Sequence, residues 1–497
     1  MRGEEMSQIV VKDLTFCYEG SLEKIFEKVS VTLDTNWKLG MIGRNGKGKT
    51  TFLQLLLGKY PYQGEIYSNV SFSYFPFSVE NKEDLVQEMC EKIAPEVPIW
   101  KIQKELSLLK MEDEVLGRTF STLSQGEQTK VLLAILFSKE NEFLLLDEPT
   151  NHLDQSSRRA VANYLKYKKG FLLVSHDRKL LDEVVDHILS INNTNIELQR
   201  GNFTSWKENR ERQDHFEQIQ KDKLQREIGK LTKAAQDTKQ WSNSVEQTKW
   251  GGQVLDKGYV GHMSAKMMKR SKVIQNRVQD KIQEKTQLLK EVEQVREITI
   301  KPLPYSKSTY LVCNKLQIGY ETKPLFPSLS FELIQTDRIA IIGKNGSGKS
   351  SLLKLVLQQP DAPDVIQGQI RIGEGLILSY VPQSTENLKG TIEQLAQQSN
   401  IPEFLLKSML FQLGVQPSEL TKQMQHLSLG QKKKILLARS LCQRAHVYIW
   451  DEPFNDIDII TRMQMEQAIL KNRITMMVIE HDEAFIDKVA TKKIVLS

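Results

Sequence analysis

A glycine-rich stretch, Gly43-Arg-Asn-Gly-Lys-Gly-Lys49-Thr50, carries residue types that can hold phosphate groups. It lies between a short apolar run and a helical pattern, which is where phosphate-binding loops occur. Glycines let successive backbone N–H groups point at a phosphate, and the N-terminus of the following helix adds partial positive charge. Lys49 would reach the β- and γ-phosphates, and the Thr50 hydroxyl would face Mg²⁺. The stretch therefore predicts a site for a nucleoside triphosphate with its magnesium ion.

This motif and three others occur twice in the chain at a nearly constant spacing. The glycine-rich stretch recurs 300 residues later, with Lys349 and Ser350 in the corresponding positions. Leu-Ser-Gln-Gly-Glu recurs as Leu-Ser-Leu-Gly-Gln, Asp-Glu-Pro recurs unchanged, and Ser-His-Asp recurs as Glu-His-Asp. The pairs are residues 43–50 and 343–350, 123–127 and 427–431, 147–149 and 451–453, and 175–177 and 480–482. Such an offset over four separated motifs predicts a tandem duplication.

Carboxylates and histidines follow apolar runs in both copies. An aspartate that ends a buried strand can hold Mg²⁺, and the glutamate after it would face an attacking water. Hydrolysis needs a group that polarises this water, together with positive charge at the γ-phosphate, which a histidine at a neighbouring strand end could contact. The aspartates are Asp147 and Asp451, the candidate catalytic glutamates are Glu148 and Glu452, and the histidines are His176 and His481.

Alternating strand and helix patterns predict an α/β fold in each copy. Short apolar runs lead into each glycine-rich stretch, each Asp-Glu-Pro motif and each His-Asp motif. Such runs suit the buried strands of a parallel sheet that is covered by helices. We therefore expect two P-loop nucleotide-binding domains, at residues 1–204 and 301–497, joined by a linker at residues 205–300.

The linker combines a helical pattern with a basic composition. Residues 207–240 and 265–296 carry apolar residues at helical spacing, including Phe216, which predicts a long antiparallel helical hairpin. Residues 207–296 carry 20 Lys and Arg against 13 Asp and Glu, whereas the rest of the chain carries 48 against 49. A basic segment on an otherwise neutral chain indicates either a polyanionic partner or a solvated helical face.

Glycines, aromatic residues and lysines gather at the predicted tip of the hairpin, near residues 241–262. The aromatic rings could stack on bases while the lysines meet phosphates. Alternatively, Trp241 and Trp250 pack on each other and close the hairpin. The candidate nucleic-acid contacts are Trp241, Lys249, Trp250, Lys257, Tyr259, Lys266, Lys269, Arg270 and Lys272.

Composition excludes several classes of protein. No stretch approaches the ~18 consecutive apolar residues that a membrane span needs, and the N-terminus lacks the apolar core of a secretory signal. The four cysteines are scattered without metal-binding spacing, which suits buried free thiols in a reducing cytosol. We therefore expect a cytoplasmic protein, which starts at Met1 or Met6.

The order of the motifs resembles that of the ABC-type ATPases. The form Asp147-Glu-Pro-Thr-Asn-His-Leu-Asp154, the twin cassettes and the helical linker resemble the ABC-F group more narrowly. The resemblance implies an ATP hydrolase with two composite sites, in which the Leu-Ser signature of one copy caps the nucleotide held by the other. It also implies that Tyr18 and Tyr320 stack on adenine.

The resemblance assigns two sets of contacts. The remaining expected ATP contacts are Gly43, Asn45, Gly46, Gly48, Lys49, Thr50, Thr51, Ser124, Gly126, Glu127, Gly343, Asn345, Gly346, Gly348, Lys349, Ser350, Ser351, Ser428, Gly430 and Gln431. The expected Mg²⁺ contacts are Thr50, Asp147, Ser350, Gln383 and Asp451.

Within the group, the chain looks most similar to the Lsa/Vga antibiotic-resistance proteins, which protect ribosomes against lincosamides, streptogramin A and pleuromutilins. This implies a monomer that pairs its own cassettes and binds the E site of the bacterial 70S ribosome. Its linker would reach towards P-site tRNA and the rRNA of the peptidyl-transferase centre.

Three other readings stay open. The first is a housekeeping ABC-F translation factor. The second is a transporter ATPase subunit, which would need a membrane partner and has no use for a basic linker. The third is a DNA-maintenance ATPase, but the arms of those proteins usually interrupt a cassette.

Two departures from the group's pattern predict unequal sites. Phe77 stands where a glutamine is expected, whereas the second copy keeps Gln383. The loss of this amide would remove a contact to Mg²⁺ or water from the first site. Residues 454–458 read Phe-Asn-Asp-Ile-Asp, where the first copy has Thr-Asn-His-Leu-Asp.

Overall fold

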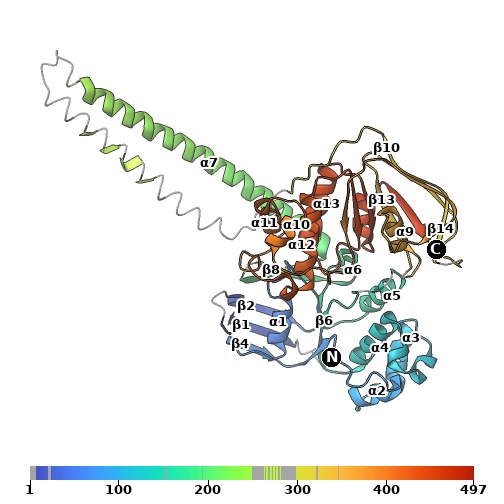
Figure 1. Ribbon diagram of the computed structural model, residues 1–497. Helices are drawn as coiled ribbons and strands as arrows, with labels where there is room; N and C mark the ends of the chain where they lie inside the picture. The colour runs from blue at the N-terminus through green and yellow to red at the C-terminus, as the bar shows by residue number, and fades with distance from the viewer. Residues whose placement is uncertain are drawn as a thin grey trace. The chain divides into compact units, whose positions relative to one another are not determined.

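The structure is a computed structural model, in which the chain forms two compact units (Figure 1). One unit comprises residues 1–203 and 295–497, and the other comprises residues 204–294. The structure describes residues 7–20, 24–151, 153, 155–192, 194–248, 262, 265–266, 269–270, 272–274, 276–277, 280, 298–320, 323–344 and 346–496.

A six-stranded sheet forms the centre of the first cassette. Its strand order is β5-β6-β7-β3-β8-β9, and all strands but the last pair in parallel. Asp147 and Met41, on the two neighbouring strands, both pair with Val174. The strands that carry the motifs therefore end at the same edge of the sheet. The strands are β3 (Lys38–Gly43), β5 (Ser71–Phe75), β6 (Glu142–Asp147), β7 (Phe171–Val174), β8 (His187–Asn192) and β9 (Asn195–Arg200).

A second, antiparallel sheet was not expected from the sequence. It has the order β2-β1-β4, formed by β1 (Gln8–Phe16), β2 (Phe26–Asp34) and β4 (Gln63–Ser68). Its apolar side chains share one core with α1 (Lys49–Leu56) and with the central sheet. The helix that follows the glycine-rich loop is therefore held between two sheets.

Helices cover the rest of the first cassette. The signature motif opens α4, and the Ser-His-Asp motif opens α6. The helices are α2 (Val86–Ile93), α3 (Ile99–Leu108), α4 (Gln125–Ser138), α5 (Gln155–Lys166) and α6 (Arg178–Val184), with short 3-10 turns at Asp113–Gly117 and Phe120–Thr122.

The second cassette repeats this arrangement, which confirms the predicted α/β class. Its parallel sheet has the order β15-β16-β17-β13-β18, and β10 pairs with β11, β12 and β14 in the antiparallel sheet. The strands are β10 (Thr309–Tyr320), β11 (Lys323–Pro324), β12 (Leu329–Ile334), β13 (Arg338–Gly343), β14 (Asp364–Ile372), β15 (Leu378–Val381), β16 (Val447–Asp451), β17 (Met476–Ile479) and β18 (Lys492–Leu496). The helices are α9 (Lys349–Val356), α10 (Ile392–Gln398), α11 (Glu403–Gln412), α12 (Leu429–Cys442), α13 (Ile459–Lys471) and α14 (Glu483–Val489), with a 3-10 turn at Met424–His426.

The linker begins with one long helix, α7 (Phe203–Thr248), of 46 residues. We expected the first linker helix to end near residue 240, but it continues for eight residues more. The reason is that no glycine or proline occurs between residue 240 and Gly251, so no helix-breaking residue ends the helix at residue 240. Phe216, predicted to pack on a partner helix, is 60% exposed.

The basic part of the linker is helical and exposed where it is described. Lys266, Lys269, Arg270 and Lys272 have helical backbone and exposed side chains. The side chain of Trp241 and all of Lys249, Trp250, Lys257 and Tyr259 lie outside the described residues. Over the ranges described here, no helix combines the length and apolar character that a membrane span requires.

Candidate functional site

The glycine-rich loops have the backbone geometry of phosphate-binding loops. Gly46 and Gly48 have φ of 79° and 97°, and Gly346 and Gly348 have φ of 82° and 87°. Residues with a side chain rarely adopt these values. At Gly48 a Cβ would also lie 2.5 Å from Cγ2 of Ile25. Each loop ends where α1 or α9 begins, so both loops place backbone N–H groups and a helix N-terminus together.

Both loop lysines fold over their own loops. Lys49 Nζ donates to the carbonyl of Gly43 at 2.8 Å, and Lys349 Nζ donates to the carbonyl of Gly343 at 2.9 Å. Burial lowers the pKa of each lysine, although nearby carboxylates oppose this shift. Each lysine therefore lies where a phosphate of a bound nucleotide would find a partly desolvated cation.

A hydroxyl and a carboxylate meet below each loop. Thr50 Oγ1 donates to Oδ2 of Asp147 at 2.9 Å, and Ser350 hydrogen-bonds the carboxylate of Asp451. Burial raises the pKa of Asp147 and raises the pKa of Asp451 to about 6. Oxygen ligands of this kind suit Mg²⁺, which usually takes one or two carboxylates and completes its shell with water and phosphate. Within the described ranges, no group of three or more His, Cys, Asp and Glu is arranged to hold a metal alone.

Sequence reasoning missed the tyrosine beside this carboxylate. Tyr74 Oη donates to Oδ2 of Asp147 at 3.1 Å, and burial raises the pKa of this tyrosine well above its ordinary value. Tyr74 lies three residues before Phe77, and Tyr380 lies three residues before Gln383. That repeated tyrosine was the available signal.

The candidate catalytic glutamates and histidines are brought together in both copies. His176 Nε2 lies 3.3 Å from Oε1 of Glu148, and His481 Nε2 lies 3.4 Å from Oε1 of Glu452. Glu148 and Glu452 have φ of 50° and 46°, which is unusual for residues with side chains. Backbone strain of this kind is concentrated at functional sites.

The environments of the two glutamates differ. Gln383 Nε2 and Asn455 Nδ2 donate to Oε2 of Glu452 at 2.8 and 2.7 Å. Burial alone would raise the pKa of Glu452, but hydrogen bonds from His481, Gln383 and Asn455 lower it to about 2. In the other copy burial raises the pKa of Glu148 to about 8, and Phe77 offers no donor. Gln383, predicted as a Mg²⁺ contact, bonds the glutamate in this structure.

The signature motifs form helix N-termini with capping boxes. Ser124 caps α4 by accepting from the N–H of Glu127, and Ser428 caps α12 by accepting from the N–H of Gln431. The Glu127 and Gln431 side chains bond back to the cap residues. The capping box uses the N–H groups of the cap residue and of the third helical residue, so the other N–H groups of the first turn could still face an anion, and the predicted capping of a nucleotide stays a prediction.

The first glycine-rich loop lies against the second cassette. Asn45 Nδ2 donates to the carbonyl of Asp456 at 2.5 Å, and the Asn45 N–H donates to Oδ2 of Asp458 at 3.2 Å. A Cβ on Gly430 of the second signature would lie 2.6 Å from the same Asn45 nitrogen. The first loop and the second signature thus share one site. Asn345, His152 and Asp154 lie outside the described residues, so the matching pairing at the second loop stays a prediction.

Asp458 is the anion of this shared site. It is buried, accepts from Lys434 Nζ at 2.8 Å and caps α13 through the N–H of Thr461. Burial alone would raise the pKa of Asp458, but Lys434 and Lys49 hold it far below its usual range. The sequence pattern marks Asp458 only as part of a departure from the group's pattern and does not predict its contact with the opposite loop.

The hydroxyls of the two predicted adenine-stacking tyrosines approach the first turns of α1 and α9. Tyr18 Oη is 2.8 Å from Oγ1 of Thr51, and Tyr320 Oη is 3.4 Å from Oγ of Ser351. Both rings are partly exposed, at 41% and 47%. Their exposed faces are accessible to a planar base, although the role remains a prediction.

A twin α/β cassette with paired P-loops, strand-end carboxylates and helix-capping signatures defines an ABC-type ATPase. The ABC transporter family profile matches residues 26–151 and 326–455, together just over half of the sequence. The chain therefore belongs to this family and is an ATP hydrolase.

Two relatives place it more narrowly. The ribosome protection protein VmlR of Bacillus subtilis is 28% identical, over 97% of this chain and 85% of that protein. The energy-dependent translational throttle protein EttA of Haemophilus influenzae is 26% identical, over 94% and 88%. These likenesses confirm the predicted resemblance to the ABC-F ribosome-protection proteins.

A solved structure supports the fold. The archaeal ribosome recycling factor aABCE1 superposes with a TM-score of 0.61 and 19% identity, covering 97% of this chain and 87% of that one.

Proposed function

We propose that this ABC-F ATPase binds the ribosome in the cytoplasm and protects it from antibiotics that act at the peptidyl-transferase centre. The proposed drugs are lincosamides, streptogramin A and pleuromutilins. In this proposal the protein is a monomer that enters the E site of the bacterial 70S ribosome. Its linker reaches towards P-site tRNA and the neighbouring rRNA. The near full-length likeness to VmlR supports this assignment.

The observation that carries the proposal is the basic linker between the cassettes. Lys266, Lys269, Arg270 and Lys272 are exposed on helical backbone, in a unit distinct from the ATPase unit. Exposed cationic side chains that do not pack in a hydrophobic core are available to bind phosphate groups. An ATPase that only pairs its cassettes has no need of such a unit.

The ATP sites supply the switch in this proposal. Lys49 and Lys349 would hold the phosphates, and Asp147 and Asp451 would hold Mg²⁺, which supplies charge neutralisation when bound. Because Gly430 already lies against Asn45, a nucleotide at the first loop would contact both cassettes at once. Binding energy from both cassettes would favour the paired state, and hydrolysis would release it.

A second candidate is a housekeeping translation factor of the same group. The 26% identity to EttA over most of both chains favours it, because that protein is named for a role in translation. Both candidates require ribosome binding, so drug protection is what separates them.

A drug-susceptibility panel tests the proposal. A sensitive bacterial host would express the wild-type chain, Glu148→Gln with Glu452→Gln, or a chain in which residues 249–261 are replaced by a short Gly/Ser turn. We expect the wild-type chain to raise the inhibitory concentrations of the three drug classes and of no drug acting elsewhere. Both variants should lose this protection at equal expression, the first because hydrolysis stops and the second because the tip is missing.

Two outcomes of the panel would change the proposal. Unchanged susceptibility with wild-type protein, together with ribosome association, would favour the translation-factor role. Full protection by the chain with the replaced tip would show that residues 249–261 are a passive cap.

A further inference from the structure

A buried ion cluster crosses from the first cassette to the second, beside the two histidine-bearing loops. Arg178 Nη2 of the first cassette lies 2.5 Å from Oε1 of Glu466 and 3.2 Å from Oδ2 of Asp482, both in the second. The three side chains are 9%, 0% and 3% exposed. Buried charges are costly unless they are paired, and Arg178 finds both of these partners in the other cassette.

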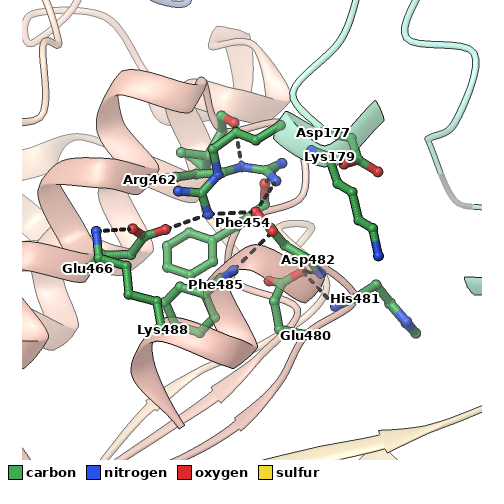
Figure 2. Close-up of polar contacts among 12 residues, drawn as sticks. Asp177, Lys179, Phe454, Arg462, Glu466, Glu480, His481, Asp482, Phe485 and Lys488 are labelled. Carbon is green, nitrogen blue, oxygen red and sulfur yellow. Dashed lines mark hydrogen bonds and ion pairs between the residues drawn. The ribbon is translucent and has the colours of Figure 1, made fainter. Parts of the chain in front are cut away.

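The cluster continues into the second cassette, as Figure 2 shows. Arg462 Nη1 lies 3.3 Å from the Asp482 oxygen that Arg178 contacts. Lys488 Nζ binds the other oxygen of Glu466 at 3.0 Å. Phe454 and Phe485 pack together below these groups, with ring centroids 4.8 Å apart. Asp482 is therefore shared by two arginines, one from each cassette.

Arg462 connects the cluster to the first nucleotide site. Its Nε donates to the carbonyl of Ile457 at 2.9 Å, and its Nη2 donates to the carbonyl of Phe454 at 2.7 Å. The segment between these two carbonyls includes Asp456, whose carbonyl accepts from Asn45 of the first glycine-rich loop. A continuous set of contacts thus runs from that loop through Arg462 to Asp482.

Arg178 also connects this set of contacts to the two candidate catalytic histidines. It follows His176 by two residues, and Asp482 directly follows His481. The pair Arg178–Asp482 therefore joins the two histidine-bearing loops, each of which lies against its own candidate catalytic glutamate. Glu480 steadies the second loop by accepting from the N–H of His481 at 2.8 Å (Figure 2).

The cluster is not repeated by the duplication. The position that matches Arg178 in the second copy is Glu483, and the position that matches Glu466 in the first copy is Ala162. Lys179 and Arg159 of the first cassette also pair with Glu483 of the second. In each of these ion pairs the first cassette supplies the cation and the second supplies the anion. The contact is thus specific to this pairing of unlike cassettes.

We propose that Arg178 is a positioning residue that couples the two nucleotide sites. By holding Asp482, it ties the position of the second histidine loop to that of the first. Through Arg462 the same carboxylate is tied to the segment that contacts the first glycine-rich loop. Nucleotide at either site then favours the arrangement that the other site needs, and the coupling is reciprocal.

The experiment measures this coupling in the full-length protein. ATP affinity at the first site is determined with the second site intact and with Lys349→Ala, and the ratio of the two dissociation constants is the coupling factor. In the wild-type chain we expect a factor of about five or more, within the usual range for coupled sites. In Arg178→Met with Glu466→Gln, which removes a cation and an anion together, the factor should fall to about one.

Two further variants separate positioning from folding. Arg178→Lys keeps the charge but replaces the planar guanidinium, whose Nη2 contacts both carboxylates, so its coupling factor should lie between those of the wild-type chain and the double variant. Arg159→Ala removes an exposed cation from the same boundary and should leave the coupling factor unchanged. Circular dichroism and thermal unfolding establish that each variant is folded.

Three results would overturn the proposal. The first is a wild-type coupling factor of about one. The second is an unchanged factor in both Arg178 variants. The third is an equal loss in the Arg159→Ala control, which would assign the effect to general charge at the boundary.

Discussion

At the scale of single residues, the two sites use the same side-chain types in different surroundings. Glu452 is held by three hydrogen-bond donors, whereas the pKa of Glu148 is raised to about 8 by burial. The Phe77 departure predicted that the sites differ, but it did not predict that Gln383 would bond the glutamate itself. That contact depends on the positive φ of Glu452, which no sequence pattern predicts.

Removing both glutamates tests their assigned role. In Glu148→Gln with Glu452→Gln, ATP hydrolysis should fall by about a hundred-fold or more, because the group that polarises water is lost. ATP binding should persist, because Lys49 and Lys349 remain. Phosphate release and nucleotide titration measure the two effects. Hydrolysis at close to the wild-type rate would show that another group activates the water.

At the scale of elements, the sequence predicted the parts that surround the motifs. The runs before Gly43 and Gly343 are β3 and β13, and the strands that end at Asp147 and Asp451 are β6 and β16. Their patterns are strong because these strands are buried on both faces. The antiparallel sheets were missed, because their half-exposed strands carry a weaker pattern. The full length of α7 was missed because the predicted break began at Trp241, although the first glycine of that stretch is Gly251.

The basic helical segment of the linker should make ribosome binding sensitive to salt. Changing Lys266, Lys269, Arg270 and Lys272 to Gln should flatten the dependence of ribosome association on salt, because fewer counterions are released on binding. Basal ATP hydrolysis should not change. Sedimentation at a series of potassium concentrations measures this slope. An unchanged slope would mean that these residues only form a solvent-exposed face of the helix and do not contact phosphate groups.

At the scale of the whole ATPase unit, the boundary between cassettes is built from buried charge. Sequence comparison of the two copies could have located it, because Arg178 and Glu483 occupy matching positions with opposite charge. The partners Glu466 and Asp482 could not be paired with Arg178 in advance, since their proximity depends on how the cassettes meet.

This boundary should weaken in acid. Burial alone would raise the pKa of Asp482, but Arg178 and Arg462 hold it below its usual range. A lowered pKa contributes stability that is present above the ordinary aspartate pKa and is lost as pH falls through the folded value. The contribution of Asp482 to stability should therefore be constant from about pH 7 to 5 and be lost below about pH 4. It is measured as the difference in unfolding temperature between the wild-type chain and Asp482→Asn, because the raised pKa values of Glu148 and Asp451 add a pH dependence that both chains share.

Asp482→Asn provides the matched control for this acid dependence. It should be less stable than the wild-type chain at neutral pH, by about 3 kcal/mol, because it leaves buried arginines short of a partner. Its further loss of stability in acid should be smaller. An acid profile parallel to that of the wild-type chain would show that Asp482 does not contribute.

Ribosome sedimentation with Glu148→Gln and Glu452→Gln tests the central claim, that ATP-paired cassettes bind the ribosome, most directly. With ATP the variant should cosediment with 70S ribosomes at near one-to-one stoichiometry, because it holds nucleotide and cannot hydrolyse it. With ADP, or with Lys49→Ala and Lys349→Ala added, it should stay in the supernatant. Absence of the variant from the ribosome pellet in ATP, although it binds ATP and is folded, would contradict the account.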